Sequence, residues 1–311
     1  MAIGALFVMT VGCSTEPTTA PATSAAEPTS TVGTVAAGTT MSEVTTTTPA
    51  SAARIVGDLS AADLAKAMTD VELAAAGGDG SVGPRQQLLY RYLSAHPELD
   101  DAVLAGVASQ ARPYVERIVR ARELGQARAT ANPNPSPPSD TVPAWKVVEP
   151  LSVDELLADY HAAETATGIG WYWLAAIHLQ ETRMGRIVGS SSAGAVGPMQ
   201  FLPDTWASCC TGDPTVARDA IIGAAAYLAE SGGPADMPAA LHDYNPNDTY
   251  VATVTAFAEN MHDNPQLYNA YHAWQVFYTT SAGTVRLPIG YSEAQPIDAA
   301  DYLADHPADA G

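Results

Sequence analysis

The stretch from residue 14 to residue 53 limits most strongly what this chain can fold into. It is dominated by Thr, Ser, Ala, Pro and Glu and contains no aromatic residue. Such a composition buries too little apolar surface to offset the entropy that a chain loses on ordering. We therefore predict a disordered tether over residues 14–57 and expect the folded part to begin near residue 58.

The first thirteen residues favour an export signal. An apolar run over residues 2–12 precedes Cys13, as in the hydrophobic region of a signal peptide that ends in small residues. The sequence VGCS around Cys13 resembles a bacterial lipobox, which implies that Cys13 is the lipid attachment site and the mature N-terminus. Residues 1–13 would then place the protein at the outer face of the cell membrane or in the cell wall. The alternative is a plain apolar N-terminus, because no Lys or Arg precedes the run.

The overall composition favours helices and excludes some partners. Hydrophobic residues make up 47% of the chain, but many are alanine and aromatic residues are only 7%, which favours long helices. No run of about 18 apolar residues occurs, so we expect membrane contact through the N-terminal lipid only. Asp and Glu number 34 against 14 Lys and Arg, and a net charge of −20 repels nucleic acid. We expect a mainly α protein and a monomer.

A proline-rich segment divides the helical patterns. Residues 58–131 are predicted to form a small helical region, with helical stretches that include residues 101–109 and 113–129. The following residues 132–138 read NPNPSPP, which ends a helix and predicts a stiff linker over residues 132–144. A second domain is predicted over residues 145–279, and a C-terminal extension over residues 280–311. Residues 284–291 alternate like a short strand in that extension.

The second domain is predicted to be helical with one long loop. Its helices are expected over residues 152–168, 171–183, 203–208, 216–230, 249–261 and 266–277. The interval 185–197 is rich in Gly and Ser and is predicted to be a loop.

A carboxylate near the end of the helix over residues 171–183 is the leading catalytic candidate. Leu174, Ile177 and Glu181 share one helix face, so Glu181 is expected at the end of an apolar stripe that faces the core. Partial burial would raise its pKa, as a general acid near neutral pH requires. The alternative is a partly exposed Glu paired with Arg183 or Arg186.

The residues after Glu181 resemble an enzyme family. Residues 191–206, SSAGAVGPMQFLPDTW, resemble the Ser-x-x-Gly-Ala-x-Gly-Leu-Met-Gln-x-x-Pro-x-Thr signature of lytic transglycosylases in the goose-type-lysozyme-like superfamily. Residues 219–228, DAIIGAAAYL, are similar to that family's Asp-Ala-x-x-Ala-Ala-x-Tyr-Leu helix, and residues 244–245 to its Tyr-Asn pair. Residues 181–186, ETRMGR, are similar to a segment of membrane-bound lytic transglycosylase B. The resemblance covers about a third of the chain, over residues 152–261.

The resemblance implies a fold, an activity and a set of site residues. The fold would be a lysozyme-like helical catalytic domain, and the substrate the glycan strands of peptidoglycan. Glu181 would be the catalytic acid and base, with Met199 and Gln200 lining the glycan groove. The remaining substrate-binding residues implied are Ser191, Tyr244 and Asn245. The two glycines of the signature, at positions 194 and 197, would let the backbone approach a bulky sugar closely.

The number of candidate carboxylates separates the possible reactions. Most glycosidases use two carboxyl groups, but Glu181 has no obvious partner. Asp204 is expected on the outer start of a helix, and Asp243 opposite Tyr244 if that segment is extended. A lytic transglycosylase needs one group, which protonates the bond between N-acetylmuramic acid and N-acetylglucosamine and then accepts a proton from the sugar's 6-hydroxyl. The alternatives are a hydrolytic muramidase and a non-catalytic glycan-binding lipoprotein.

No cofactor or metal is expected. Between Trp206 and Asp219 the chain has too few acids for a calcium site of six to eight oxygens, and the His residues lack the spacing of a zinc site. Cys209 and Cys210 are adjacent, which leaves either a strained disulfide or two thiols.

Overall fold

The computed structural model describes residues 57–311, and these form a mainly α protein with twelve α-helices. The predicted signal peptide, the predicted lipid attachment site Cys13 and the predicted tether up to residue 56 lie outside the described residues. Among residues 57–311, no helix has both the length and the apolar character needed to cross a membrane. The predicted helical fold class is confirmed for this part of the chain.

The first four helices form the region predicted over residues 58–131. They are α1 (Ala61–Ala76), α2 (Gly83–Ala95), α3 (Asp100–Gly106) and α4 (Arg112–Ala131), with 3₁₀ turns at Gly80–Val82 and Pro97–Leu99. The helix α1 begins after Ser60, whose side chain accepts a hydrogen bond from the Asp63 amide.

Seven further helices follow the proline-rich segment. They are α5 (Val153–Thr167), α6 (Trp171–Thr182), α7 (Pro203–Cys209), α8 (Ala217–Glu230), α9 (Met237–Tyr244), α10 (Asp248–Asp263) and α11 (Leu267–His272). Two differ from the sequence prediction. The helix α9 was not predicted. Asp243 lies in this helix, so the assumption that the segment around Asp243 is extended is wrong. The helix α11 ends at His272 because the chain enters strand β4 at Val276.

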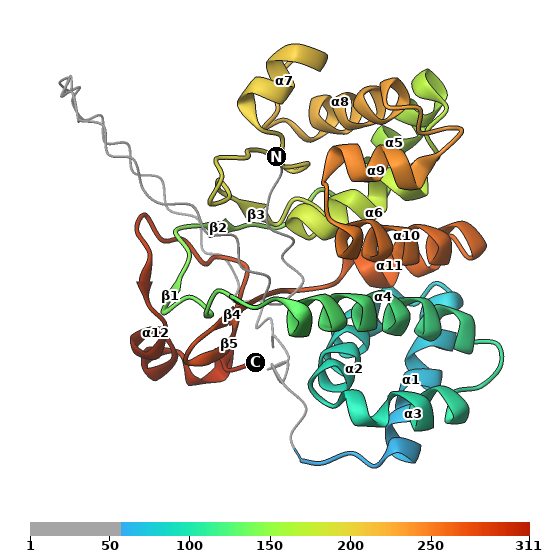
Figure 1. The fold of residues 1–311 in the computed structure, drawn as a ribbon, viewed down its shortest axis with the longest axis vertical. Coiled ribbons are helices and arrows are strands. Elements are labelled where there is room, and N and C mark those ends of the chain that lie inside the picture. Colours follow the sequence, from blue (N-terminus) through green and yellow to red (C-terminus); the bar gives the residue numbers. More distant parts are fainter. Residues whose placement is uncertain (1–56) are drawn as a thin grey trace, which may run out of the picture.

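The two sets of helices share one hydrophobic core. The core is continuous from Leu64 in α1 to Trp274 after α11. In Figure 1, α10 and α11 lie between the first four helices and the group formed by α5, α6, α8 and α9, and α10 packs against both α4 and α6. The indole of Trp274 donates a hydrogen bond to Gln86 in α2. Residues 132–144 therefore separate two stretches of sequence, but not two hydrophobic cores.

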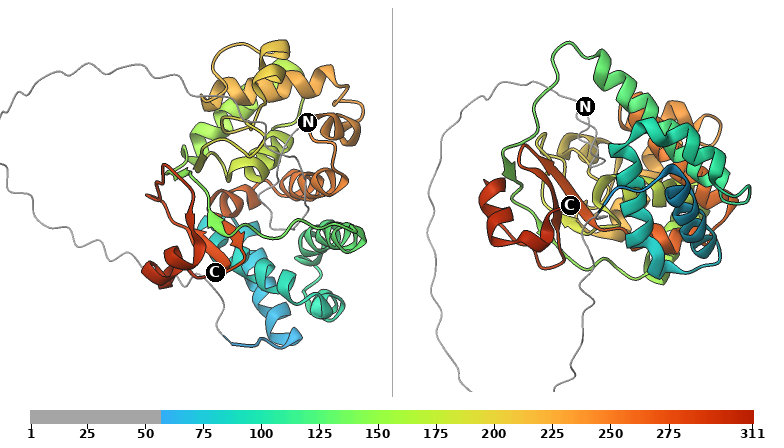
Figure 2. Two further views of the ribbon diagram at one scale, coloured as in Figure 1. Left: turned by 60° about the vertical axis from the view of Figure 1, so that its left-hand side comes forward. Right: turned by 90° about the horizontal axis from the view of Figure 1, so that it is seen from below.

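The C-terminal residues form a small β-containing layer. Strands β4 (Val276–Thr280) and β5 (Gly283–Leu287) make an antiparallel hairpin, which Figure 2 shows beside α12 (Ala299–Asp305). One short pair ties this layer to the segment before α5: β1 (Thr141–Val142) pairs with β6 (Ile297–Asp298). A separate short pair joins β2 (Lys146–Val147) to β3 (Ile187–Val188). A final 3₁₀ turn covers Pro307–Asp309. The strand predicted over residues 284–291 is shorter, because Pro288 has no N–H for a ladder.

Candidate active site

The helix that carries Glu181 is buried on every side. All residues from Leu174 to Thr182 in α6 are buried, because α5, α8, α10 and α11 pack around it. The face predicted to turn toward the core, with Leu174, Ile177 and Glu181, is buried, and so are the other faces of this part of the helix. A helix that is apolar almost all round belongs at the centre of a fold rather than at its surface. Its central position removes Glu181 from bulk water more completely than an amphipathic helix would.

Glu181 is a buried carboxyl. Its residue is 6% exposed, and burial raises the pKa of the carboxyl from 4.5 to about 8. The Tyr250 hydroxyl partly offsets this rise in pKa, although no hydrogen bond of standard geometry joins the two groups. Within the described residues no ion pair joins Glu181 to a cation, and Arg186 instead donates to the carbonyls of Arg183 and His272. The alternative of a partly exposed Glu181 in an ion pair with Arg183 or Arg186 is therefore wrong.

The backbone turns sharply directly after this carboxylate. Arg183 and Met184 adopt φ values of 56° and 62°, and Gly185 follows at 82°. Left-handed backbone costs roughly 1–2 kcal/mol for each residue other than glycine. The hydroxyl of Thr182 holds the turn, because it donates to the carbonyl of Pro198 at 2.6 Å and accepts from the amide of Gly185. The turn thus fixes the end of α6 against the loop that contains Met199.

The loop over residues 191–201 is shaped mainly by its own hydrogen bonds. The hydroxyl of Ser191 accepts from the amides of Ala193 and Ala195, so this side chain holds a turn. Gln200 adopts φ of 50°, and its side-chain nitrogen Nε2 donates to the carbonyl of Gly197 at 2.9 Å. Met199 is fully buried.

The two signature glycines in this loop differ. A Cβ atom at Gly197 would lie 1.8 Å from the carbonyl oxygen of Pro214, so the absence of a side chain permits contact with the protein's own backbone. A Cβ atom at Gly194 would meet no atom within 4 Å, and its φ of 81° is what favours glycine there. The backbone of Gly197 was expected to approach a sugar closely, but it approaches the backbone of Pro214.

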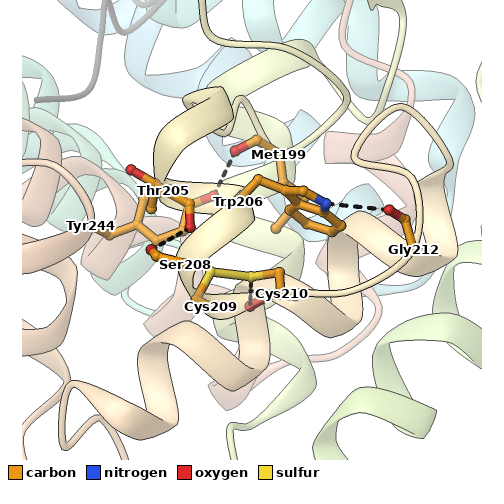
Figure 3. Close-up of a disulfide and its surroundings, with 9 residues drawn as sticks. Met199, Thr205, Trp206, Ser208, Cys209, Cys210, Gly212 and Tyr244 are labelled. Atoms are coloured by element: carbon orange, nitrogen blue, oxygen red, sulfur yellow. Dashed lines mark hydrogen bonds between the residues drawn. A yellow bond between two sulfur atoms is a disulfide. The ribbon is translucent and has the colours of Figure 1, made fainter.

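Tyr244 joins this loop to the helices beside Glu181. It is the last residue of α9, and its hydroxyl donates to the Met199 carbonyl at 2.5 Å, as Figure 3 shows. Its ring stacks on Tyr250, with centroids 6.5 Å apart and planes 9° from parallel. The negative charge of Glu181 contributes to the raised pKa of Tyr244 and Tyr250, after burial itself.

The structure thus brings some of the predicted residues together and adds one. Glu181 and Tyr244 lie within electrostatic reach, and Tyr244 contacts Met199. Ser191 and Gln200 lie on the same loop as Met199, and Asn245 is buried directly after α9. Tyr250 was missed because it reads as an ordinary core aromatic of α10, a helix that begins after the cap Asn247.

The two other candidate carboxylates are both exposed. Asp204 is exposed in the first turn of α7, as expected, and Asp243 is exposed near the end of α9. A small cavity of about 50 Å³ lies between the Gln200 end of the loop and Tyr227, Asp243 and Tyr244. No carboxylate among residues 57–311 contributes to the pKa shift of Glu181.

The segment between α7 and α8 contains a disulfide. Cys209 and Cys210 are bonded to each other at the end of α7, beside Trp206, whose indole donates to the carbonyl of Gly212 (Figure 3). The nearby acids are engaged locally, because Asp213 accepts from the Thr215 amide and Asp219 from the Asp213 amide. Over the part of the chain with described coordinates, no group of three or more His, Cys, Asp or Glu residues could hold a metal ion.

No family model, no curated protein and no solved structure matches the chain.

Proposed function

We propose that this protein is a peptidoglycan lytic transglycosylase with a lysozyme-like catalytic domain and Glu181 as its single acid and base. The observation that carries the proposal is the carboxyl of Glu181, which is buried, has no ion pair with any of residues 57–311 and has a pKa of about 8. A carboxylic acid that keeps its proton at neutral pH can donate it to a leaving group.

The isolation of Glu181 supports a non-hydrolytic reaction. Retaining and inverting hydrolases place a second carboxyl group roughly 5–9.5 Å from the first, as nucleophile or as base for water. The exposed Asp204 and Asp243 leave the pKa of Glu181 without any contribution from a second carboxylate. One group that serves in turn as acid and base fits this arrangement.

The proposed reaction uses two proton transfers. Protonated Glu181 donates to the oxygen that joins N-acetylmuramic acid to N-acetylglucosamine, and that bond breaks. The resulting carboxylate then accepts the proton of the muramoyl 6-hydroxyl, whose oxygen bonds to the anomeric carbon. The product is a 1,6-anhydromuramoyl end, and Glu181 regains its proton without consumption of water.

The tyrosine pair suits a carboxyl that cycles between charge states. Tyr244 donates its hydroxyl proton to the Met199 carbonyl, while the buried Tyr250 hydroxyl faces Glu181 without a standard hydrogen bond. When Glu181 ionises, a small rotation of Tyr250 would give the new carboxylate a hydrogen-bond donor. Hydrogen bonds to the charged form of an acid favour that form.

The experiment is mass spectrometry of the fragments released from purified peptidoglycan by the full chain. Anhydro fragments, lighter by one water than their reducing counterparts, are expected from the unaltered protein and absent with Glu181→Gln. The matched control is Glu230→Gln, because Glu230 is exposed at the end of α8. Reducing muramoyl ends would mean a muramidase instead. Binding of glycan without any release would mean a glycan-binding protein.

We further propose that the protein is exported and anchored through a lipid on Cys13, which leaves the folded part at the outer face of the membrane. The apolar run before Cys13 and the acidic, low-complexity segment after it support this location. The test is incorporation of labelled palmitate by the producing bacterium. Label is expected in the unaltered chain and absent in Cys13→Ser, whereas labelling of neither chain contradicts the anchor.

A further inference from the structure

A second cavity lies away from Glu181. It has a volume of about 430 Å³ and is enclosed by the segment after β2, by strand β3, by α5 and α6 and by the loop around Pro198. We call it the β3 pocket. Its lining includes none of Glu181, Met199, Gln200 and Tyr244. The volume falls within the range of roughly 300–1,000 Å³ that is usual for sites of small organic molecules.

One ring nitrogen of a histidine in the wall of the β3 pocket has no hydrogen bond within residues 57–311. The Nδ1 atom of His178 lies 2.7 Å from the Tyr160 hydroxyl, whereas its Nε2 atom is buried without a hydrogen bond among the described residues. Burial lowers the pKa of His178 to about 3, so the imidazole is neutral. A Cβ atom at Gly185 would lie only 3.2 Å from Nε2, so glycine at this position avoids a tight contact with the ring.

The mouth of the β3 pocket is apolar. Val148, Leu151 and Val188 line it and are 37%, 43% and 49% exposed, so three exposed large hydrophobic side chains gather at one pocket. Val216, next to the lining residue Thr215, is 47% exposed. An exposed apolar rim around a concave pocket marks a binding site more often than it marks plain surface.

The charge of the β3 pocket restricts the ligand. Among the described residues that line it, the exposed Glu149 is the one charged side chain. Its negative charge acts on Arg186 and His272, which also face His178 and are not part of the lining. The lining therefore offers no cation to an anionic group, while its apolar side chains and the neutral imidazole suit an uncharged molecule.

We propose that the β3 pocket binds a neutral small molecule with an apolar body and one hydrogen-bonding group that reaches His178. The pocket volume, the unpartnered Nε2 atom and the exposed rim each point to such a ligand. This site is independent of the glycan chemistry proposed for Glu181, so either assignment can fail without the other.

The test is an NMR titration of the full chain with 2-naphthol, which has two fused apolar rings and one hydroxyl. We expect saturable binding with a Kd of about 0.1–1 mM, as is usual for a ligand of this size. In protein with ¹⁵N-labelled histidine, the Nε2 resonance of His178 should shift along the same saturation curve. The anionic 2-naphthalenesulfonate should bind at least about tenfold more weakly.

Two tryptophan variants locate the binding. Ala217→Trp fills the pocket from the first residue of α8 and should weaken 2-naphthol binding at least about tenfold. Ile222→Trp is the matched control, because Ile222 is exposed on the same helix outside the lining. If Ala217→Trp does not fold, Val188→Trp at the exposed rim carries the same expectation. Absent binding, equal binding of the sulfonate, or unchanged affinity in the filled pocket would overturn the proposal.

Discussion

The buried carboxyl of Glu181 makes the stability of the protein depend on pH in a calculable way. Burial raises its pKa from 4.5 to about 8, so the folded state holds a proton that the unfolded state releases. The stability that Glu181 contributes is fully present below pH 4.5 and is lost as the pH rises through 8. Each pH unit in this window costs about 1.4 kcal/mol. The loss amounts to about 3 kcal/mol at pH 7 and about 5 kcal/mol above pH 8.

Substitution by glutamine isolates this contribution. Glutamine has nearly the same shape and stays neutral, so the free energy of unfolding of Glu181→Gln should lack this pH dependence. The variant should gain on the unaltered protein by about 4–5 kcal/mol between pH 4 and pH 8.5. All other titrating groups are common to both proteins and cancel in the difference.

The assay is urea unfolding at pH 4, 5.5, 7 and 8.5, followed by tryptophan fluorescence. Glu230→Gln, which removes an exposed carboxyl, is the matched control for the substitution itself. A difference that is constant with pH for Glu181→Gln would mean that the carboxyl of Glu181 ionises as in water. That result would refute both the burial argument and the use of Glu181 as an acid near neutral pH.

Three further predictions concern the core and the loop. Burial raises the Glu72 pKa to about 7, so the free energy of unfolding of Glu72→Gln should gain about 3 kcal/mol on the unaltered protein between pH 4.5 and pH 7. Urea unfolding at several pH values would detect this gain. Gly197→Ala should lower the free energy of unfolding by at least about 3 kcal/mol, because its Cβ would lie 1.8 Å from a backbone oxygen. Gly194→Ala should lower it by about 1 kcal/mol, from its left-handed backbone alone. Equal losses in urea unfolding would contradict this. Tyr244→Phe should cost about 1–2 kcal/mol in thermal or urea unfolding, because the buried carbonyl of Met199 loses its donor, and no loss would mean that the carbonyl finds another.

Much of the local structure could be predicted from the sequence. Periodic apolar residues and caps located the long helices, and Ser152 with Glu155 forms a capping box at the start of α5. The helix α9 was missed because it is only eight residues long and follows a segment rich in Gly and Pro. Pro238 lies in its first turn, where a proline is compatible with a helix.

Other features could not be predicted, because they depend on contacts between distant segments. The proline-rich residues 132–144 suggested a domain boundary, yet Trp274 and Gln86, far apart in sequence, meet in one core. The left-handed backbone at Arg183 and Met184 adjoins Thr182, which is hydrogen-bonded to Pro198 in the neighbouring loop. No local pattern of residues encodes that bond.

The sequence by itself determined that the described chain is helical, where its long helices lie and that Glu181 stands near the end of one of them. These properties follow from local periodicity and capping, which act over a few residues. Only the tertiary structure decided that α6 is surrounded by other helices and that Tyr244 and Tyr250 lie near its carboxyl. The physical reason is that a pKa depends on the surroundings of a group in three dimensions, and distant segments supply those surroundings.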